Sequence, residues 1–324
     1  MTTYYVSKSG SDSGDGSSDS PWLSINHAMQ SGLQPGDEVV VRPGTYTEQV
    51  AFTADGAPGQ YITLRSEVPG EALIRPPAGT YSTITMRGDY TVVDGFDVVG
   101  GSGHAIDGEQ NHHSIVRNNI AHDSGGSGIS FYLSEFQTIE NNVVYGNAST
   151  NGYQTSGISV ASNINVSGDT TTTGFRTIVR NNVSHDNVET DVPGNHTDGN
   201  GIIIDWLRND GTGYPAYNYP TLVDGNLVYN NGSKGIQVFM SDNVTVRNNT
   251  AYHNNVDLQN SGTERGEINI SSTAGNAVVV NNIAVADPSI NAHNSAFSLA
   301  VSSAVVHDNL GFNGDCCIER EAGD

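Results

Sequence analysis

The 324-residue sequence has little that would crosslink a protein or anchor it in a membrane. Its two cysteines, Cys316 and Cys317, are adjacent, and such a pair makes neither a disulfide framework nor a zinc site. No run of 18 apolar residues occurs, so no membrane span is expected, and the start MTTYYVSKSG lacks the basic and apolar regions of a signal peptide. The fold must therefore depend on its own hydrophobic core.

Positive charge is also scarce, with 13 Lys and Arg against 35 Asp and Glu and a net charge of −22. Only Lys8 and Lys234 are lysines. A chain this acidic repels nucleic acid and anionic membranes, so neither is expected as a partner. An anionic ligand would need a local basic cluster or a bound cation; the alternative is that the acidity serves solubility alone.

Gly (38 residues), Asn, Ser, Thr and Val are plentiful, which is typical of a turn-rich β protein. One pattern recurs between residues 91 and 314, and no helical pattern interrupts it. The second Asn of each repeat lies at Asn119, Asn142, Asn182, Asn226, Asn249, Asn282 and Asn309. A basal spacing of 23 residues with variable insertions predicts a parallel β-helix, a solenoid with coils about 4.8 Å apart.

The Asn repeat is interpreted as architectural, with each amide bonding its equivalent one coil away. In NGIIID (200–205), Ile202 and Ile204 should point inward and Ile203 and Asp205 outward. A charge row two residues before the Asn markers should form a surface ladder: Arg117, Glu140, Arg180, Asp224 and Arg247. Three histidines at matching places are expected to stack: His122, His185 and His253.

The predicted organisation is one structural domain. Residues 1–50 form an N-terminal cap and the first strands, 51–315 the parallel β-helix, and 316–324 a C-terminal tail. The segment LSINHAMQSG predicts a short helix with Ser24 as its N-cap and Gly32 as its stop. Such a helix would cover the open end of the solenoid.

The opening YYVSKSGSDSGDGSSDSPWLSINHAMQSGLQPGDEVVVRPGTYTEQV, followed by Asn-rich repeats, resembles the right-handed parallel β-helix proteins of the pectate-lyase-like superfamily. The opening is most similar to polysaccharide lyases of family nine. The stretches HTDGNGIIID and GSKGIQVFMSDNVTVRNNTAYHNN are similar to alginate-lyase-like members of families thirty-one and six. The resemblance implies an all-β, single-stranded right-handed parallel β-helix with an N-terminal capping helix. The superfamily also holds C5-epimerases and hydrolases, so the fold alone does not determine the chemistry.

Two long interruptions of the repeat, between Asn142 and Asn226, are expected to form the walls of a groove. The second interruption is rich in aromatic rings, which pack on sugar faces; the alternative is a loop packed on the solenoid wall. The residues predicted to bind substrate are Arg208, Asn200, Trp206, Tyr214 and Tyr217.

Lys234 is the leading catalytic candidate. It opens the strand KGIQV, and alignment of the Gly–Ile pairs stacks it on Asn200, two residues from Asp198. Removing the C5 proton of a uronate needs a base and a cation that neutralises the carboxylate. In lyases of families nine and six a lysine is held to be that base, and the resemblance assigns the role to Lys234. The alternative is a solvated lysine on the outer wall.

Arg265 aligns within one residue of the position that lies opposite Lys234 on the next coil. In family six, an arginine beside the lysine base binds the substrate carboxylate or protonates the leaving oxygen, and the resemblance implies this role for Arg265. The alternative is an ion pair with its flanking glutamates. Arg208 is the competing arginine. His196 is a candidate for neutralising a carboxylate or passing a proton.

Calcium is a candidate cofactor, with Asp186, Asp198 and Asp205 as its ligands. The resemblance carries this assignment, because Asp198-Gly199 and Asp205 resemble the DG…D stretch of family nine. This chain has two extra residues there, Asn200 and Gly201. The alternative is that the carboxylates face water or pair with Arg208.

The preferred hypothesis is a secreted, monomeric polysaccharide lyase that cleaves an acidic uronate polymer by β-elimination. Alginate is favoured, with pectate and glucuronan as the other substrates. One alternative is a mannuronan-type C5-epimerase, in which Tyr214, Tyr217 or Tyr219 returns the proton. The others are a glycoside hydrolase, which the lack of an adjacent Asp-Asp pair disfavours, and a non-catalytic glycan-binding β-helix.

Overall fold

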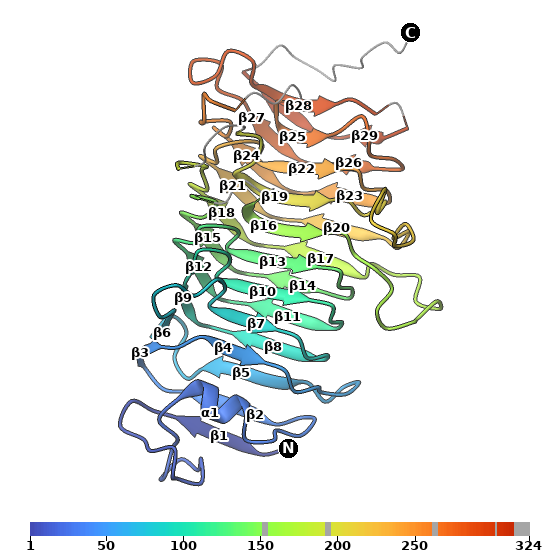
Figure 1. Cartoon of the computed structure of the whole chain (residues 1–324). Helices are drawn as coiled ribbons and strands as arrows, with labels where there is room; N and C mark the ends of the chain where they lie inside the picture. The colour runs from blue at the N-terminus through green and yellow to red at the C-terminus, as the bar shows by residue number, and fades with distance from the viewer. Residues whose placement is uncertain (151–154, 192–195, 261–264, 302, 314–324) are drawn as a thin grey trace.

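A computed structural model describes residues 1–150, 155–191, 196–260, 265–301 and 303–313 of the chain. Three sheets run along the molecule, and from β2 to β28 each turn of the chain contributes one strand to each sheet in the order A, B, C (Figure 1). Equivalent strands of successive coils pair in parallel, and such connections are right-handed. The right-handed parallel β-helix expected from the sequence is therefore confirmed.

Sheet A has eleven described strands: β1 (Thr3–Val6), β2 (Glu38–Val41), β5 (Ile62–Ser66), β8 (Thr91–Asp94), β11 (Ser114–Arg117), β14 (Thr138–Glu140), β17 (Thr177–Arg180), β20 (Thr221–Asp224), β23 (Val244–Arg247), β26 (Val278–Val280) and β29 (Val305–His307). Sheet B has ten: β3 (Gly44–Thr47), β6 (Ala72–Arg75), β9 (Asp97–Val99), β12 (Ile120–His122), β15 (Val143–Tyr145), β18 (Val183–His185), β21 (Leu227–Tyr229), β24 (Thr250–Tyr252), β27 (Ile283–Val285) and β30 (Leu310–Phe312). Sheet C has nine: β4 (Val50–Phe52), β7 (Ile84–Met86), β10 (Ile106–Glu109), β13 (Ile129–Tyr132), β16 (Ser156–Ala161), β19 (Asn200–Asp205), β22 (Ile236–Phe239), β25 (Gly266–Ile270) and β28 (Ser295–Leu299).

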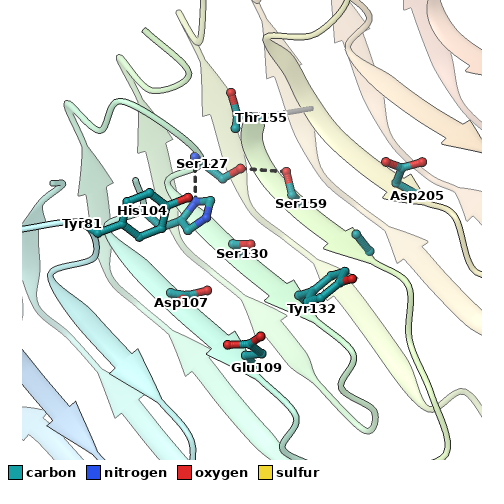
Figure 2. A pocket seen from close by; sticks show the side chains of 11 residues that line it. Tyr81, His104, Asp107, Glu109, Ser127, Ser130, Tyr132, Thr155, Ser159 and Asp205 are labelled. Carbon is teal, nitrogen blue, oxygen red and sulfur yellow. Dashed lines mark hydrogen bonds between the residues drawn. The ribbon is translucent and has the colours of Figure 1, made fainter. Parts of the chain in front are cut away.

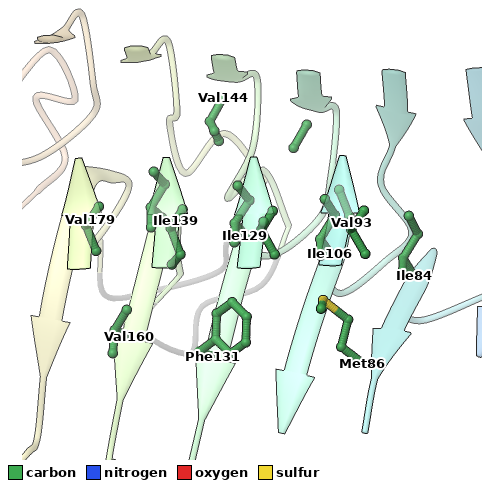
Figure 3. Close-up of a cluster of buried hydrophobic side chains, with 14 of the residues drawn as sticks. Ile84, Met86, Val93, Ile106, Ile129, Phe131, Ile139, Val144, Val160 and Val179 are labelled. Atoms are coloured by element: carbon green, nitrogen blue, oxygen red, sulfur yellow. The ribbon is translucent and has the colours of Figure 1, made fainter. Parts of the chain in front are cut away.

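The core is a column of aliphatic and aromatic side chains inside the three sheets (Figure 3). Alternation along each strand sends every second residue into this column, as Ile129 and Phe131 of β13 show. Ile202 and Ile204 of β19 belong to the core cluster and Ile203 does not, which confirms the predicted inward and outward faces.

The predicted Asn ladder lies at the turn between sheets A and B. Each side-chain amide donates to the carbonyl oxygen of the next Asn at 2.9–3.2 Å, without a break from Asn119 to Asn309. The residue before each of these Asn positions adopts a left-handed backbone, as at Asn118 (φ 57°). The ladder thus satisfies the polar groups of this corner on each coil from Asn119 to Asn309.

A second ladder, which the sequence analysis missed, lies at the turn between sheets B and C. Asn147, Asn187, Asn231 and Asn254 bond one another at 2.8–2.9 Å, and Glu267 accepts from Asn254. All of these residues are buried. This ladder holds the corner from which the chain enters sheet C.

The outer surface confirms the predicted charge row. Arg117 pairs with Asp94, Arg180 with Glu140 and Arg247 with Asp224 on neighbouring coils of sheet A. On sheet B, five rings stack in register with centroids 4.7–5.3 Å apart: His122, Tyr145, His185, Tyr229 and Tyr252. His253 lies one residue beyond this stack, so its predicted place in the row is wrong.

The N-terminal helix is short. Ser24 is the N-cap of α1 (Ile25–Met29), as predicted, and its side chain accepts from the backbone N–H of His27. The helix ends at Met29, before the predicted stop at Gly32. Ile25, Ala28 and Met29 are buried against the first coil. That this helix caps the solenoid remains a prediction, as do the three boundaries of the sequence-based organisation. Residues 316–324 lie outside the described residues.

Much of each long interruption lies between sheet C and sheet A, at residues 162–176 and 206–220. The two segments pack on each other: Asn209 donates to the carbonyl of Asn163, and Asn165 to the hydroxyl of Tyr219. Arg176, fully buried, binds Glu135 at 2.9 Å beneath them. None of the described helices has the length and apolar character needed to span a membrane.

Candidate active site on the outer face of sheet C

The register of sheet C places the candidate residues in one row across the coils. The inward residues Ile106, Ile129, Ile158, Ile202, Ile236 and Ile268 pair in sequence from β10 to β25. The positions two residues earlier are therefore equivalent as well: His104, Ser127, Ser156, Asn200, Lys234 and Gly266. The row confirms the predicted alignment of Lys234 with Asn200 and Gly266.

An open pocket of about 320 Å³ lies in front of β10, β13, β16 and β19 (Figure 2). Small side chains form its floor, at Ser130, Ser159 and Ala161. Two partly exposed rings border it, Tyr81 (55% exposed) and Tyr132 (41% exposed). These small side chains leave space between the larger Asp107 and Glu109 of β10 and Asp205 of β19.

His104 lies at the edge of this pocket and has a defined tautomer. Its Nδ1 accepts the backbone N–H of Ser127 at 3.0 Å, so Nδ1 carries no proton. Burial lowers the pKa of His104, which keeps the ring neutral at pH 7. The remaining proton is therefore on Nε2, and His104 is a hydrogen-bond donor.

Three carboxyl groups line the pocket. Asp107 and Glu109 both bind Arg87, at 3.2 and 2.9 Å. Asp205 is 3% exposed, its Oδ1 has no hydrogen-bond partner in the described structure, and burial raises its pKa to about 7. Asp205 therefore exchanges its proton near neutral pH.

Lys234 lies at the corner where the chain enters sheet C. Its residue is 4% exposed, its backbone N–H donates to Asn200 Oδ1 at 3.1 Å, and its Nζ lies 3.5 Å from the carbonyl of Thr197. Burial raises the pKa of neighbouring Asp198, and the ammonium of Lys234 acts in the opposite direction. The lysine is thus held inside the corner and is not a solvated residue of the outer wall.

His196, Glu189 and Asp257 converge beside this corner. His196 Nδ1 lies 2.5 Å from Asp257 Oδ2, and the potential ligand atoms of the three residues lie within 4.8 Å of one another. All three are buried, and burial together with the charge of Asp198 raises the pKa of Glu189 to about 7. In the described part of the chain this is the group able to hold a metal ion.

The two candidate arginines lie at opposite ends of sheet C strands. Arg265 directly precedes Gly266, the partner position of Lys234, and its guanidinium donates to Asn291 Oδ1 and to the carbonyl of Asn260. Arg208 follows β19 and binds Asp242 at 2.9 Å. Arg265 therefore lies next to the row that contains Lys234, whereas Arg208 lies beyond the other end of its strand.

Two of the predicted substrate-binding residues are corrected by their burial. Tyr217 is 2% exposed and packs in the core, where its ring cannot contact a polymer. Asn200 is fully buried and its amide bonds Ser156 and Asp198, so it supports the Lys234 row from within. Trp206 donates to the carbonyl of Asp210 and Tyr214 is 40% exposed, both in the segment after β19.

The structure does not bring the predicted calcium ligands together. Asp186 is exposed at the end of β18 and bonds His185, Asp198 is buried before β19, and Asp205 ends that strand. The triad that does converge contains an imidazole. Calcium takes six to eight oxygen ligands, whereas imidazole with carboxylates suits transition metals. The predicted calcium ligands therefore do not form a site among the described residues, whereas this triad could hold a metal ion.

Sequence reasoning missed His104 and Asp257, whereas Glu189 belongs to the acidic set between Asn182 and Asn226 that was considered for calcium. His104 would have been found by extending the alignment of Lys234 with Asn200 to the preceding coils, because His104 lies four coils before Lys234 in the same row. Nothing in the repeat pointed to Asp257, because it lies 61 residues from His196 in a different loop.

The fold and this face define a β-helix protein of the class that includes polysaccharide lyases and epimerases. The family model described as the Pel9A-like right-handed beta helix region matches residues 4–205, and the chain belongs to this family.

Other similarities are more remote. A mannuronan C5-epimerase, AlgE5 of Azotobacter vinelandii, is 30% identical over 151 residues, which is 45% of this chain and 12% of the relative's own length. The crystal structure of pectate lyase Pel9A matches with a TM-score of 0.58 and 20% identity, over 98% of this chain and 82% of that chain. An alginate lyase of Paenibacillus sp. str. FPU-7 matches with a TM-score of 0.55 and 18% identity, over 94% and 99% of the two chains. At these identities the solved structures show the shared fold alone.

Proposed function

We propose that this chain is a lyase that cleaves a uronate-containing polysaccharide by β-elimination, with Lys234 as the base. The observation that supports it best is the position of Lys234, one of only two lysines, held in a buried corner on the row that leads to the pocket. Membership of the Pel9A-like family adds to this support, since the name denotes a pectate lyase.

In the proposed step, the amine of Lys234 takes the proton from C5 of a uronate. The electron pair of the C5–H bond forms the C4–C5 double bond, the C4–O bond breaks, and the leaving oxygen takes a proton. Arg265 is proposed to neutralise the uronate carboxylate, which acidifies C5, and His196 is a candidate to supply the proton. No step is assigned to calcium, because its predicted ligands do not form a site among the described residues.

Alginate is the first substrate to test, followed by pectate and glucuronan, because the chain is similar in fold to an alginate lyase and a pectate lyase. These polymers lie outside cells, so an extracellular location and action as a monomer belong to the proposal.

A C5-epimerase is the second candidate, supported by the 30% identity to the mannuronan epimerase. Both reactions begin with removal of the C5 proton, and an epimerase returns a proton to the opposite face. Tyr214, with its exposed ring, is then the candidate donor.

The proposal is tested by the absorbance of unsaturated uronate after mixing the protein with each polymer, in calcium and in EGTA. We expect a rise with one polymer that persists in EGTA. If no polymer gives a rise but C5 exchanges with solvent deuterium, the protein is an epimerase; if neither occurs, the proposal is overturned.

Replacing Lys234 by alanine tests the base directly. We expect loss of at least about 100-fold in kcat, because a positioned base contributes about 10²–10⁴-fold. Lys8→Ala is the matched control, because Lys8 lies over the Tyr46 ring in the first coil and should leave kcat unchanged. A folded Lys234→Ala protein that retains full activity contradicts the assignment.

A further inference from the structure

The pocket in front of sheet C carries the wrong charge for a uronate. Asp107, Glu109 and Asp205 line it, and none of its described lining residues is Lys or Arg. The nearby Arg87 is already shared between Asp107 and Glu109. A uronate carboxylate placed here would meet like charge without a cationic partner among the described lining residues, which is unfavourable.

The same pocket suits the hydroxyl groups of a neutral sugar. The carboxylates of Asp107 and Glu109 accept hydrogen bonds from hydroxyls, and the carboxyl group of Asp205 also lines the pocket. Nε2 of His104 is a donor, because Nδ1 is occupied by Ser127. The exposed ring of Tyr132, beside the small Ala161, offers an apolar face to a sugar ring (Figure 2).

We propose that this pocket binds a neutral sugar unit, so that the substrate is a heteropolysaccharide in which neutral sugars accompany uronates. The binding of a neutral sugar is inferred from the pocket alone. The presence of uronates in the same polymer rests on the lyase function proposed above.

The position of the pocket agrees with one polymer contacting both places. The pocket extends from β10 to β19, and β22, which Lys234 precedes, is the next strand in the sheet. Thr155 lines the pocket and its carbonyl accepts the backbone N–H of Gly199, beside Asp198. Successive coils are about 4.8 Å apart, so the coil of His104 lies about 19 Å from that of Lys234, four strands along. A chain that lies along the helix axis therefore passes the neutral-sugar pocket before it reaches Lys234.

The test is titration calorimetry with short oligosaccharides. Galactotriose and xylotriose are the neutral probes, and trigalacturonate and trimannuronate are the uronate probes, each with calcium and with EGTA. Neutral probes are used with the wild-type chain, because they lack the carboxylate that elimination needs. Uronate probes are used with Lys234→Gln and, if that variant does not fold, with the wild-type chain at early times.

We expect a neutral probe to bind in EGTA at the pocket, whereas uronate probes bind at the corner of Lys234 and Arg265 and are not affected by changes in the pocket. Tyr132→Ala should weaken neutral binding by about tenfold or more, and Tyr132→Phe should retain most of it. Phe312→Ala is the control, an exposed ring at the end of β30 far from the pocket, and should bind as the wild type does.

Two results overturn the proposal. One is neutral-probe binding that Tyr132→Ala does not weaken. The other is calcium-dependent uronate binding that Tyr132→Ala abolishes, which would make the pocket a cation-bridged uronate subsite. Absence of neutral binding while uronate polymers are still cleaved refutes the pocket assignment and leaves the lyase intact. Neutral binding without any cleavage refutes the lyase and leaves the pocket assignment.

Discussion

At the scale of single residues, Asn182 shows how one side chain joins three coils. Its Oδ1 accepts from the backbone N–H and the amide of Asn142, both at 3.0 Å. Its own amide donates to the carbonyl of Ile139 at 2.9 Å and to Asn226 at 3.0 Å. All of these groups are buried, so water cannot replace the lost partners.

We expect Asn182→Ala to destabilise the protein by about 1–3 kcal/mol for each buried group left unpaired. Urea unfolding measures the change, and Asn218→Ala, at an exposed position in the segment after β19, is the control. A variant as stable as this control would mean that the ladder contributes no net stability.

At the scale of elements, the segments 162–176 and 206–220 are held by one buried ion pair. The guanidinium of Arg176 binds Glu135, and it also lies over the rings of Tyr219 and Phe136. Glu135 in turn accepts from the backbone and hydroxyl of Ser167, in the first segment. The pair therefore connects the coil of β14 to both segments.

Arg176→Met should destabilise the protein by about 3–5 kcal/mol, because it leaves Glu135 buried and unpaired. The double variant Arg176→Met/Glu135→Gln should lose less, since the uncompensated charge is gone. Arg180→Met, which removes a pair on the exposed face of sheet A, should cost about 1 kcal/mol or less. Equal losses in Arg176→Met and Arg180→Met would contradict the argument.

At the scale of the whole molecule, several of the many acidic side chains are buried. Burial raises the pKa of Glu189, Asp205 and Glu267 to about 7. Each group binds its proton more tightly when folded, so its contribution to stability is present at low pH and is lost as pH rises to about 7, from about 4.5 for the two glutamates and about 3.8 for Asp205. His113, whose pKa burial lowers to about 4, acts in the opposite direction.

The contribution of Glu267 is isolated by comparison with Glu267→Gln. Because the charged form of Glu267 is disfavoured by burial, the wild type should lose stability relative to the variant between pH 5 and pH 8. Urea unfolding at pH 5, 6, 7 and 8 measures this difference. A difference that stays constant with pH would show that Glu267 titrates normally in the fold.

The repeating coil of this protein is predictable from its sequence. Marker residues such as Asn119 and Asn182, the alternating charges at Arg117 and Glu140, and the inward Ile202 and Ile204 were all predictable. The physical reason is that strand alternation and turn chemistry repeat locally, so a periodic sequence contains them. The same register placed Lys234 opposite Asn200.

Only the tertiary structure decided which parts of the insertions meet. It buried Tyr217, separated Asp186 from Asp198, and brought Asp257 to His196 from a loop on another coil. Insertions interrupt the repeat, so their residues have no periodic position, and their contacts depend on how each loop packs against its neighbours. The pocket arises likewise, because its small floor residues leave space only when four strands lie side by side.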